Sequence, residues 1–181
     1  MKFKLPYGKK KLDLEIKDKQ VKGVLTSKVE DYEVKETEKE LVRKALANPV
    51  ESDKLSELSR DKDKIVIISS DHTRPVPSHI TMPILLEEIR KGNPEADITI
   101  LVATGVHRPS TEKELRDKYG DKIFEEEKII NHNSRDDDTL IKIGTLPSGG
   151  DLIVNKMAVE ADLLIAEGFI EPHFFAGYSG G

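Results

Sequence analysis

Three short apolar runs, each followed directly by a polar segment, constrain the fold of this chain more than any other feature of its sequence. They span residues 65–68, 98–103 and 163–166 and are rich in isoleucine, leucine and valine. Short, nearly continuous apolar runs are typical of strands buried in a parallel sheet. Apolar residues at helical spacing follow the first two runs, at 80–91 and 112–119. This alternation predicts an α/β fold with an open, mainly parallel sheet flanked by helices.

Smaller elements are expected around this α/β core, which we place at 64–181. Residues 1–27 predict a small antiparallel meander, because three stretches alternate polar and apolar side chains: 2–5, 12–16 and 21–25. The other expected elements are a helix at 38–47 capped by Thr37, a short helix at 52–59, a capping box of Thr111 and Glu114 on the helix at 112–119, a hairpin within 139–154 and a short helix near 155–160.

Composition excludes several classes of function. The chain has no cysteine, which excludes disulfides and thiol nucleophiles and leaves any chemistry to histidine, carboxylate and lysine side chains. Its 29 basic and 34 acidic residues are mixed in sign without a basic block, so we expect no nucleic-acid partner. No apolar run reaches the ~20 residues of a membrane span, and the N-terminus lacks the pattern of a secretory signal. We therefore expect a cytoplasmic protein with no membrane partner.

Each of the three apolar runs leads into a segment rich in chemically active side chains. Asp71, His72, Thr73 and Arg74 follow the first run, His107 follows the second, and the third leads to the segment that contains His173. Loops at the carboxyl ends of parallel strands leave from the same edge of the sheet, where ligands of open α/β folds bind. The topology therefore predicts that Asp71, Arg74, His107 and His173 converge.

The two histidines are candidate acid–base groups. A lone histidine at a helix entry is usually a solvent-exposed residue, and His107 taken alone fits that description. The functional interpretation depends on His173, which arrives from another strand end between Glu171-Pro172 and Phe174-Phe175, an aromatic setting expected to limit water. Imidazoles with an unperturbed pKa near ~6.5 act as acid or base near neutrality. A pair of them is what a racemase requires.

Arg74 is the candidate anion-binding residue. It lies between a predicted buried strand and Pro75-Val76-Pro77, a stiff loop that would hold its guanidinium in place for a carboxylate or phosphate. The segment 71–74 could instead be a simple helix entry, with Asp71 or Thr73 capping backbone amides. For His72 alone we favour that structural role. The five histidines show no recognisable ligand spacing, so we expect no metal site formed by this chain alone.

The three segments together resemble the N-terminal domain of the nickel-dependent lactate racemase family. The likeness covers the whole chain in order and spacing, and its motifs are Asp71-His72-Thr73-Arg74-Pro75, Ala103-Thr104-Gly105-Val106-His107-Arg108-Pro109 and Glu171-Pro172-His173-Phe174-Phe175-Ala176-Gly177-Tyr178-Ser179-Gly180-Gly181. The resemblance implies two α/β domains with the active site between them. Residues 1–181 would be the N-terminal catalytic domain, and the C-terminal domain would be absent from this chain.

The resemblance also implies a cofactor and roles for particular residues. The cofactor is a nickel-pincer nucleotide, a pyridinium mononucleotide that carries nickel and is supplied by cofactor-biosynthesis proteins. In the implied scheme, His107 and His173 are the two bases that exchange the hydroxyl proton of lactate while hydride passes from the α-carbon to the cofactor. Arg74 would hold the substrate carboxylate, and Asp71, His72, Thr73 and Arg74 would contact the cofactor.

The family's cofactor-anchoring lysine and nickel-ligating histidine lie beyond Gly181. We therefore expect no metal ligand within this chain, no cofactor retained by residues 1–181 and no racemase activity from them alone. Two alternatives stay open: a racemase or epimerase of another 2-hydroxy acid, such as malate or a sugar acid, and a nucleotide- or anion-binding module. In the module, Arg74, Arg108 and the amides of Gly105, Gly180 and Gly181 would only hold phosphate.

Overall fold

The computed structural model describes residues 1–28 and 31–180 of the chain and divides into two compact units, Met1–Lys35 and Glu36–Gly181. In the first unit, β1 (Lys2–Tyr7) and β2 (Lys10–Glu15) form an antiparallel hairpin that is followed by a 3-10 turn at Asp18–Gln20. Residues 21–25, expected as a third strand, form none. Alternation of side chains favours a strand only where a neighbouring strand offers hydrogen bonds, and these residues pair with no strand.

The second unit is built on a four-stranded parallel sheet. Its strands lie in the order β5-β4-β3-β8, and all neighbouring pairs are parallel. In chain order the elements are α1 (Glu38–Ala47), α2 (Leu55–Leu58), β3 (Lys64–Ser70), α3 (Ser78–Gly92), β4 (Asp97–Ala103), α4 (Glu112–Tyr119), α5 (Asp121–Glu126), β5 (Lys128–Asn131), a 3-10 turn at Asp137–Thr139, β6 (Leu140–Thr145), β7 (Asp151–Asn155), α6 (Lys156–Val159), β8 (Leu163–Glu167), β9 (Glu171–His173) and β10 (Gly177–Ser179). This confirms the predicted fold class. It adds α5, β5 and the hairpin of β9 and β10, none of which we expected.

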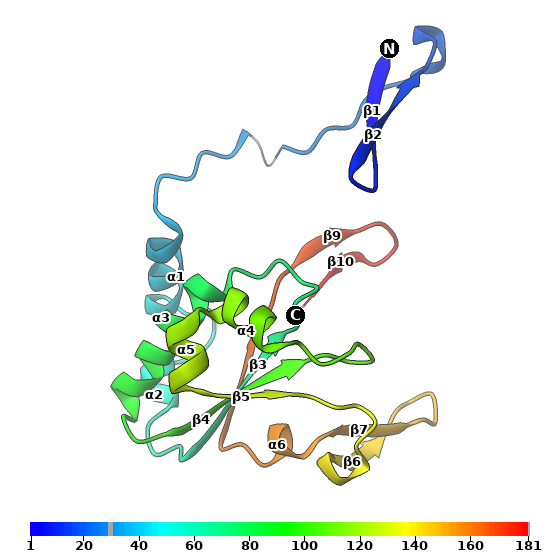
Figure 1. Ribbon diagram of the computed structural model, residues 1–181. Coiled ribbons are helices and arrows are strands. Elements are labelled where there is room, and N and C mark those ends of the chain that lie inside the picture. The colour runs from blue at the N-terminus through cyan, green and yellow to red at the C-terminus, as the bar shows by residue number, and fades with distance from the viewer. Residues whose placement is uncertain (29–30, 181) are drawn as a thin grey trace. The chain divides into compact units, whose positions relative to one another are not determined.

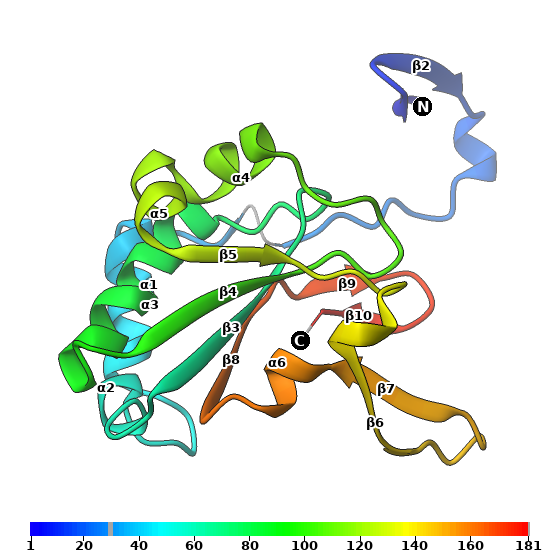
Figure 2. The same ribbon diagram turned by 60° about the horizontal axis from the view of Figure 1, so that its bottom comes forward.

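The two faces of the sheet are covered by different elements (Figures 1 and 2). Helices α3, α4 and α5 cover one face, with α1 and α2 packed against α3. On the other face lie α6 and the hairpin formed by β6 and β7 (Figure 2). The cap expected at Thr37 is present and forms a capping box with Glu40 at the start of α1, and the expected capping box of Thr111 with Glu114 begins α4.

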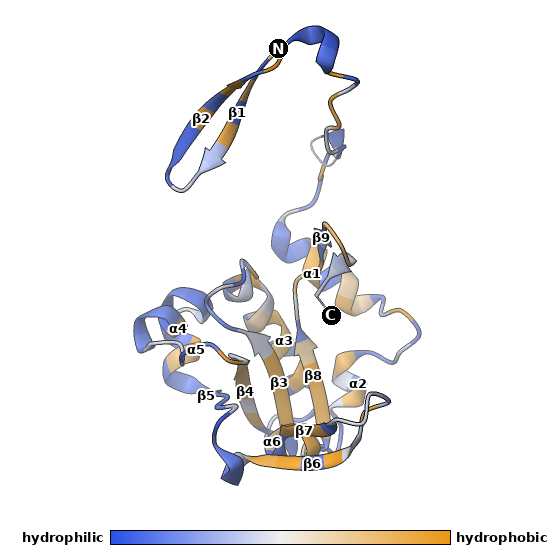
Figure 3. Ribbon diagram, turned by 90° about the vertical axis from the view of Figure 1, so that its right-hand side faces the viewer, coloured by the Kyte–Doolittle hydropathy of each residue, from blue (hydrophilic) through white to orange (hydrophobic). Residues whose placement is uncertain are grey.

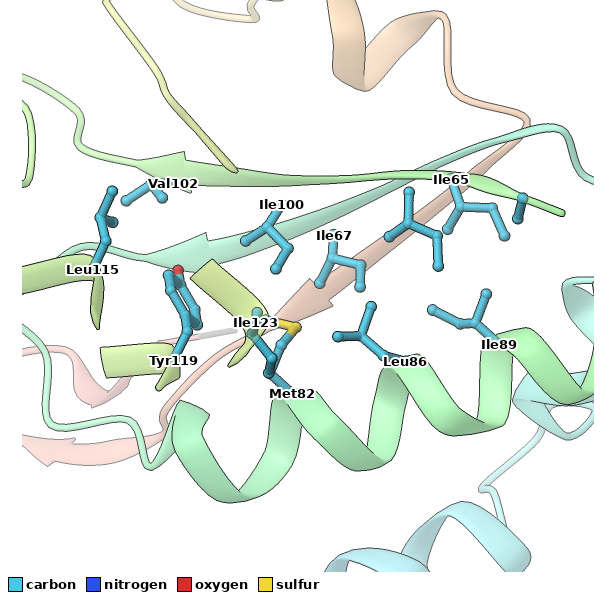
Figure 4. Packing of buried hydrophobic residues seen from close by; sticks show 12 residues of the cluster. Ile65, Ile67, Met82, Leu86, Ile89, Ile100, Val102, Leu115, Tyr119 and Ile123 are labelled. Carbon is cyan, nitrogen blue, oxygen red and sulfur yellow. The ribbon is translucent and has the colours of Figure 1, made fainter. Parts of the chain in front are cut away.

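The core lies between the sheet and α3 to α5. Figure 4 shows Met82, Leu86 and Ile89 of α3 pointing toward Ile67 of β3 and Ile100 of β4, and all five are buried. The spacing of the three α3 residues places them on one helical face. Figure 3 shows that the central strands are hydrophobic. The helical face is buried against these strands, and this burial holds the helices on the sheet.

The strand β8 differs from the expected fully buried strand. It lies at the edge of the sheet, beside β3 alone, and its residues alternate between half-buried and exposed. Leu163 and Ile165 pack against the core, whereas Leu164 is 46% exposed. An apolar run therefore marked a strand correctly without showing that one of its faces is open. Among the described residues, no helix is both long and apolar enough to cross a membrane.

Candidate active site

The carboxyl ends of β3, β4 and β8 border a pocket of about 410 Å³. Its walls come from the segments that follow these strands, within 68–76, 103–107 and 166–169, together with Gly180. Strand β4 lies on one side of β3 and β8 on the other, so the winding of the chain reverses at β3. A crevice at such a reversal is where open α/β sheets bind ligands. Of the four residues predicted to converge here, Asp71, Arg74 and His107 line the pocket, whereas its described wall does not include His173.

Asp71 is a buried residue of the pocket wall that accepts hydrogen bonds from its neighbours. Its side chain is only 3% exposed, and Oδ1 accepts hydrogen bonds from the Thr73 backbone N–H (2.9 Å) and from Thr73 Oγ1 (2.6 Å). Burial opposes ionisation of this carboxyl, but the hydrogen bonds from Thr73 and His107 outweigh burial and lower the pKa of Asp71. The residue is therefore a carboxylate at neutral pH.

His107 is held by this carboxylate. Its Nδ1 lies 2.6 Å from Asp71 Oδ2, and its side chain is 49% exposed, so the ring is fixed on one side and open on the other. A carboxylate only accepts hydrogen bonds, which assigns the proton of the neutral ring to Nδ1. Nε2 then has a free lone pair. The pair has the arrangement of an oriented general base.

Arg74 lines the same pocket and follows Asp71 in the same loop. Its backbone N–H donates to the Asp71 carbonyl oxygen at 3.3 Å, which closes a turn. No side chain among the described residues pairs with its guanidinium. The charge is thus available to an anionic ligand. Thr73 also lines this pocket.

His72 points to a different place. It lines a second pocket of about 330 Å³ that also contains Arg74, His79 and Lys118. Its Nδ1 lies 3.1 Å from Ser110 Oγ, and its Nε2 lies 3.8 Å from Glu114 Oε1. Arg74 therefore borders both pockets, whereas His72 contacts the start of α4.

His173 lies on β9, in the hairpin that follows β8 at the same sheet edge (Figure 1). Over the described residues, the wall of the 410 Å³ pocket does not include it. Its Nδ1 accepts backbone N–H bonds from Phe175 (3.5 Å) and Ala176 (3.3 Å), and its ring contacts those of Phe174 and Phe175. The two phenylalanines are 93% and 79% exposed, so within this chain they do not exclude water as we had expected.

The two histidines therefore have different partners. His107 donates from Nδ1 to a buried carboxylate, whereas His173 accepts at Nδ1 from backbone amides. In the neutral state this leaves a lone pair at Nε2 of His107 and a proton at Nε2 of His173. At Nε2, His107 therefore offers a hydrogen-bond acceptor and His173 a hydrogen-bond donor.

The end of the described chain closes one side of the pocket. Gly180 lies against the carbonyl of Phe169 with φ of +107°, and a Cβ atom at this position would overlap that carbonyl oxygen. Only glycine fits this close approach. Gly181, which we had counted among candidate anion-binding amides, lies outside the described residues.

Two residues of the site were missed by the sequence analysis. Glu167, the last residue of β8, lines the pocket. Lys118 of α4 is not part of its wall but contacts the wall residue Ser70, with Nζ 3.4 Å from Ser70 Oγ. A carboxylate that ends an apolar strand run was a usable signal for Glu167. Lys118 has no such signal, since its helix is rich in exposed charges.

Arg108 does not behave as the anion-binding module requires. Its guanidinium makes two hydrogen bonds to Glu114, at 2.8 and 2.6 Å, and Glu114 also completes the cap of α4. A guanidinium held by a carboxylate in this way is a poor ligand for phosphate. Arg74 is thus the stronger anion-binding candidate of the two.

Comparison with known proteins gives consistent results. The family model of the lactate racemase N-terminal domain matches residues 7–181. The lactate racemase of Lactiplantibacillus plantarum is 59% identical over 177 residues, and that of Thermoanaerobacterium thermosaccharolyticum is 53% identical over 179. These matches cover 98% and 99% of this chain but 42% of each relative. The chain thus spans less than half the length of these relatives.

Solved structures agree with the sequence matches. The structure of the lactate racemase apoprotein from T. thermosaccharolyticum matches with a TM-score of 0.89 and 51% identity, over 99% of this chain and 41% of that one. A crystal structure of a Thermotoga maritima protein matches with a TM-score of 0.62 at 21% identity, over 78% of this chain and 36% of that one, and it supports the fold alone. On the family match and the identities together, this chain belongs to the lactate racemase N-terminal domain family.

Proposed function

We propose that this chain supplies one side of the active site of a lactate racemase, an isomerase that interconverts L- and D-lactate. One observation carries the proposal: in a member of this family, a buried carboxylate orients His107 at the pocket that Arg74 also lines. The site thus combines an oriented base with a free cation, the two groups that a 2-hydroxy acid requires at its hydroxyl and its carboxylate.

The residues present fit the nickel-pincer nucleotide that the family implies. The pocket is within the size range of small-molecule sites, roughly 300–1,000 Å³. The Arg74 guanidinium is free to pair with phosphate or carboxylate, and Asp71 and Thr73 extend the polar wall. When bound, the cofactor would accept the α-hydrogen of lactate as hydride and return it. Nickel ligands and the covalent anchor are expected from the part of the relatives' length that this chain does not cover, and other proteins would make the cofactor.

The chain's own residues would orient the substrate and move its proton. Arg74 would hold the lactate carboxylate through two parallel hydrogen bonds, which fixes the α-carbon. His107 would take the hydroxyl proton at Nε2, and the Asp71 carboxylate would stabilise the imidazolium that forms. His173 would exchange the corresponding hydroxyl proton of the opposite enantiomer, giving it as an imidazolium and taking it as a neutral ring with its lone pair on Nε2. Removing the hydroxyl proton as hydride departs avoids a carbanion beside the negatively charged carboxylate.

The test is made in a cofactor-loaded protein of the relatives' full length that carries these residues. His107→Gln and His173→Gln are each expected to lower the rate of racemisation by about 10²–10⁴-fold, the usual contribution of a positioned base. Bound nickel should stay unchanged. His79→Gln is the matched control, because His79 is exposed and lies outside the 410 Å³ pocket.

Two outcomes would contradict the proposal. Loss of nickel with either variant, without a separate catalytic defect, would favour a nucleotide- or anion-binding module. The second outcome is a preference for malate or a sugar acid over lactate, measured as loss of optical rotation with a panel of L-2-hydroxy acids. We further propose that residues 1–181 alone do not racemise lactate, which an assay of this chain with added cofactor would test.

A further inference from the structure

Glu167 has an unusual set of partners for a carboxylate at the end of a strand. Its Oε2 accepts hydrogen bonds from Ser69 Oγ (2.7 Å) and Ser78 Oγ (2.8 Å), and its Oε1 accepts one from Thr81 Oγ1. The three hydroxyls come from β3 and from the first turn of α3, whereas Glu167 comes from β8. One side chain therefore joins three elements.

Two of these hydroxyls flank the loop that carries the candidate site. Ser69 and Ser78 lie on either side of residues 70–77, which include Asp71 and Arg74. Both serines are fully buried, so their hydroxyls have no access to water and depend on Glu167 for a hydrogen-bond acceptor. The carboxylate thus fixes both ends of this loop at one point.

The same residue begins the segment that leads to His173. Glu167 ends β8, and the next two residues, Gly168 and Phe169, line the pocket before the chain enters β9. A shift of the Glu167 side chain would therefore move the loop with Arg74 and the start of the segment with His173 relative to one another.

The surroundings of Glu167 include a cation as well as the three hydroxyl donors. The Lys118 ammonium is close enough to interact with the charges of Glu167 and Asp71; burial lowers the pKa of Lys118, and these two carboxylates oppose that shift. Three hydroxyl donors further stabilise an acceptor-only group. A neutral amide of the same shape would face the hydroxyls with one acceptor oxygen instead of two.

We propose that Glu167 is a positioning residue that sets the geometry between the loop bearing Asp71 and Arg74 and the segment bearing His173. Its relevance to catalysis rests on the function proposed above, whereas its effect on the two segments can be measured without cofactor. Glu167 is not required to touch the substrate. It acts through Ser69, Ser78 and Thr81, whose side-chain hydroxyls donate to it.

The first experiment measures amide hydrogen exchange by mass spectrometry in the full-length apoprotein. Glu167→Gln is expected to raise exchange in residues 70–77 and 168–176 by about 10-fold, as expected when hydrogen bonds to a charged group are lost. Glu127→Gln is the matched control. Glu127 accepts two hydrogen bonds from Arg90 but lies before β5, at the opposite edge of the sheet.

Unchanged exchange in both segments would overturn the proposal. An equal rise throughout the strands β3 and β4 would also overturn it, since that pattern indicates a general loss of stability. A further check uses Ser69→Ala and Ser78→Ala. Each should raise exchange in 70–77 in the wild-type background and add little once Glu167 is glutamine, because both act through the same carboxylate.

The second experiment uses the cofactor-loaded enzyme. Glu167→Gln is expected to raise KM for lactate through Arg74 and to lower kcat by about 10–100-fold, as small misplacements of catalytic groups do, with nickel content unchanged. An unchanged KM and kcat would contradict the positioning role. If His107→Gln is inactive while Glu167→Gln shows wild-type exchange and kinetics, the Glu167 proposal fails and the proposed function stands. If no variant racemises any hydroxy acid, the exchange data still decide the role of Glu167.

Discussion

Asp71 shows how one short side chain can serve two neighbours. One oxygen accepts from the backbone N–H of Thr73, two residues ahead, which is the geometry of an Asx turn. The other oxygen accepts from His107, which follows a different strand. A glutamate would be one methylene too long to make the same local turn. The residue type therefore links the shape of its own loop to the orientation of the base.

Replacing Asp71 by asparagine should weaken the fold in a pH-dependent way. The folded-state pKa of Asp71 is lowered, so the carboxylate stabilises the fold above its unfolded pKa of about 3.9, and that stabilisation is lost as the pH falls through the lower folded value. Asp71→Asn should therefore lower the free energy of unfolding at pH 7 by about 1–3 kcal/mol. Urea unfolding of this chain at pH 7 and at successively lower pH measures the difference, which should shrink below about pH 4.

The control for this prediction is Asp117→Asn. It makes the same change of charge on an exposed helical residue that pairs with Lys113 at the surface. Little loss is expected there at any pH, because exposed ion pairs contribute little. A pH-independent loss for Asp71→Asn would show that the carboxylate charge is not what stabilises the loop.

At the scale of elements, α3 connects the core to the site. Its apolar face packs on the sheet, its first turn carries Ser78 and Thr81, which bind Glu167, and its last residue meets α2. That last residue is Gly92, and a Cβ there would overlap the Ser56 carbonyl oxygen and crowd Ser59 Oγ. Ser59 is fully buried and donates to the Ile89 carbonyl. The contact between the two helices thus requires a residue without a side chain.

Gly92→Ala should therefore destabilise the protein, although alanine is the better helix former by about 1 kcal/mol. Overlap with backbone and with a buried hydroxyl is expected to cost about 1–3 kcal/mol. Urea unfolding followed by circular dichroism measures the change. Gly144→Ala in β6 is the matched control, because nothing lies within 4 Å of the added carbon. A stabilised Gly92→Ala variant would mean that α2 moves away at no cost.

At the scale of the whole chain, the buried core belongs to the unit that begins at Glu36. Its clustered side chains come from the central strands and α3 to α5. The unit Met1–Lys35 instead has a hairpin on which Leu5, Leu12 and Leu14 are 46%, 50% and 38% exposed. These leucines share one face with Phe3, since Phe3 pairs with Leu14 and Leu5 with Leu12. Stability of the second unit is therefore expected to come from its own core.

Residues 36–181 are accordingly expected to unfold cooperatively when residues 1–35 are removed. The thermal midpoint should change by less than about 4 °C, the shift that 1 kcal/mol causes in a chain of this size. Thermal unfolding followed by far-ultraviolet circular dichroism compares the two forms. Loss of the cooperative transition would show that the N-terminal residues complete the core.

The class of fold and the edge that carries the site could be predicted from local sequence. Apolar runs identified β3, β4 and β8, and capping residues identified α1 and α4, because both signals depend on neighbours within a few residues. The same reasoning could not detect α5 and β5, whose short segments between 121 and 131 carry many charges. It also predicted a third strand at 21–25, where no partner strand exists.

Within the site, the sequence by itself determined that Asp71, Arg74, His107 and the segment containing His173 follow three predicted strands. Parallel strands bring their carboxyl ends to one edge of the sheet, so the sequence also determined that these segments start from the same edge. Only the tertiary structure decided which of these side chains meet. It paired Asp71 with His107, turned His72 toward α4, and placed Glu167 against hydroxyls 86 to 98 residues away in sequence. The physical reason is that hydrogen bonds depend on distances of a few ångströms between segments far apart in the chain. Local propensity and periodicity contain no information about such distances.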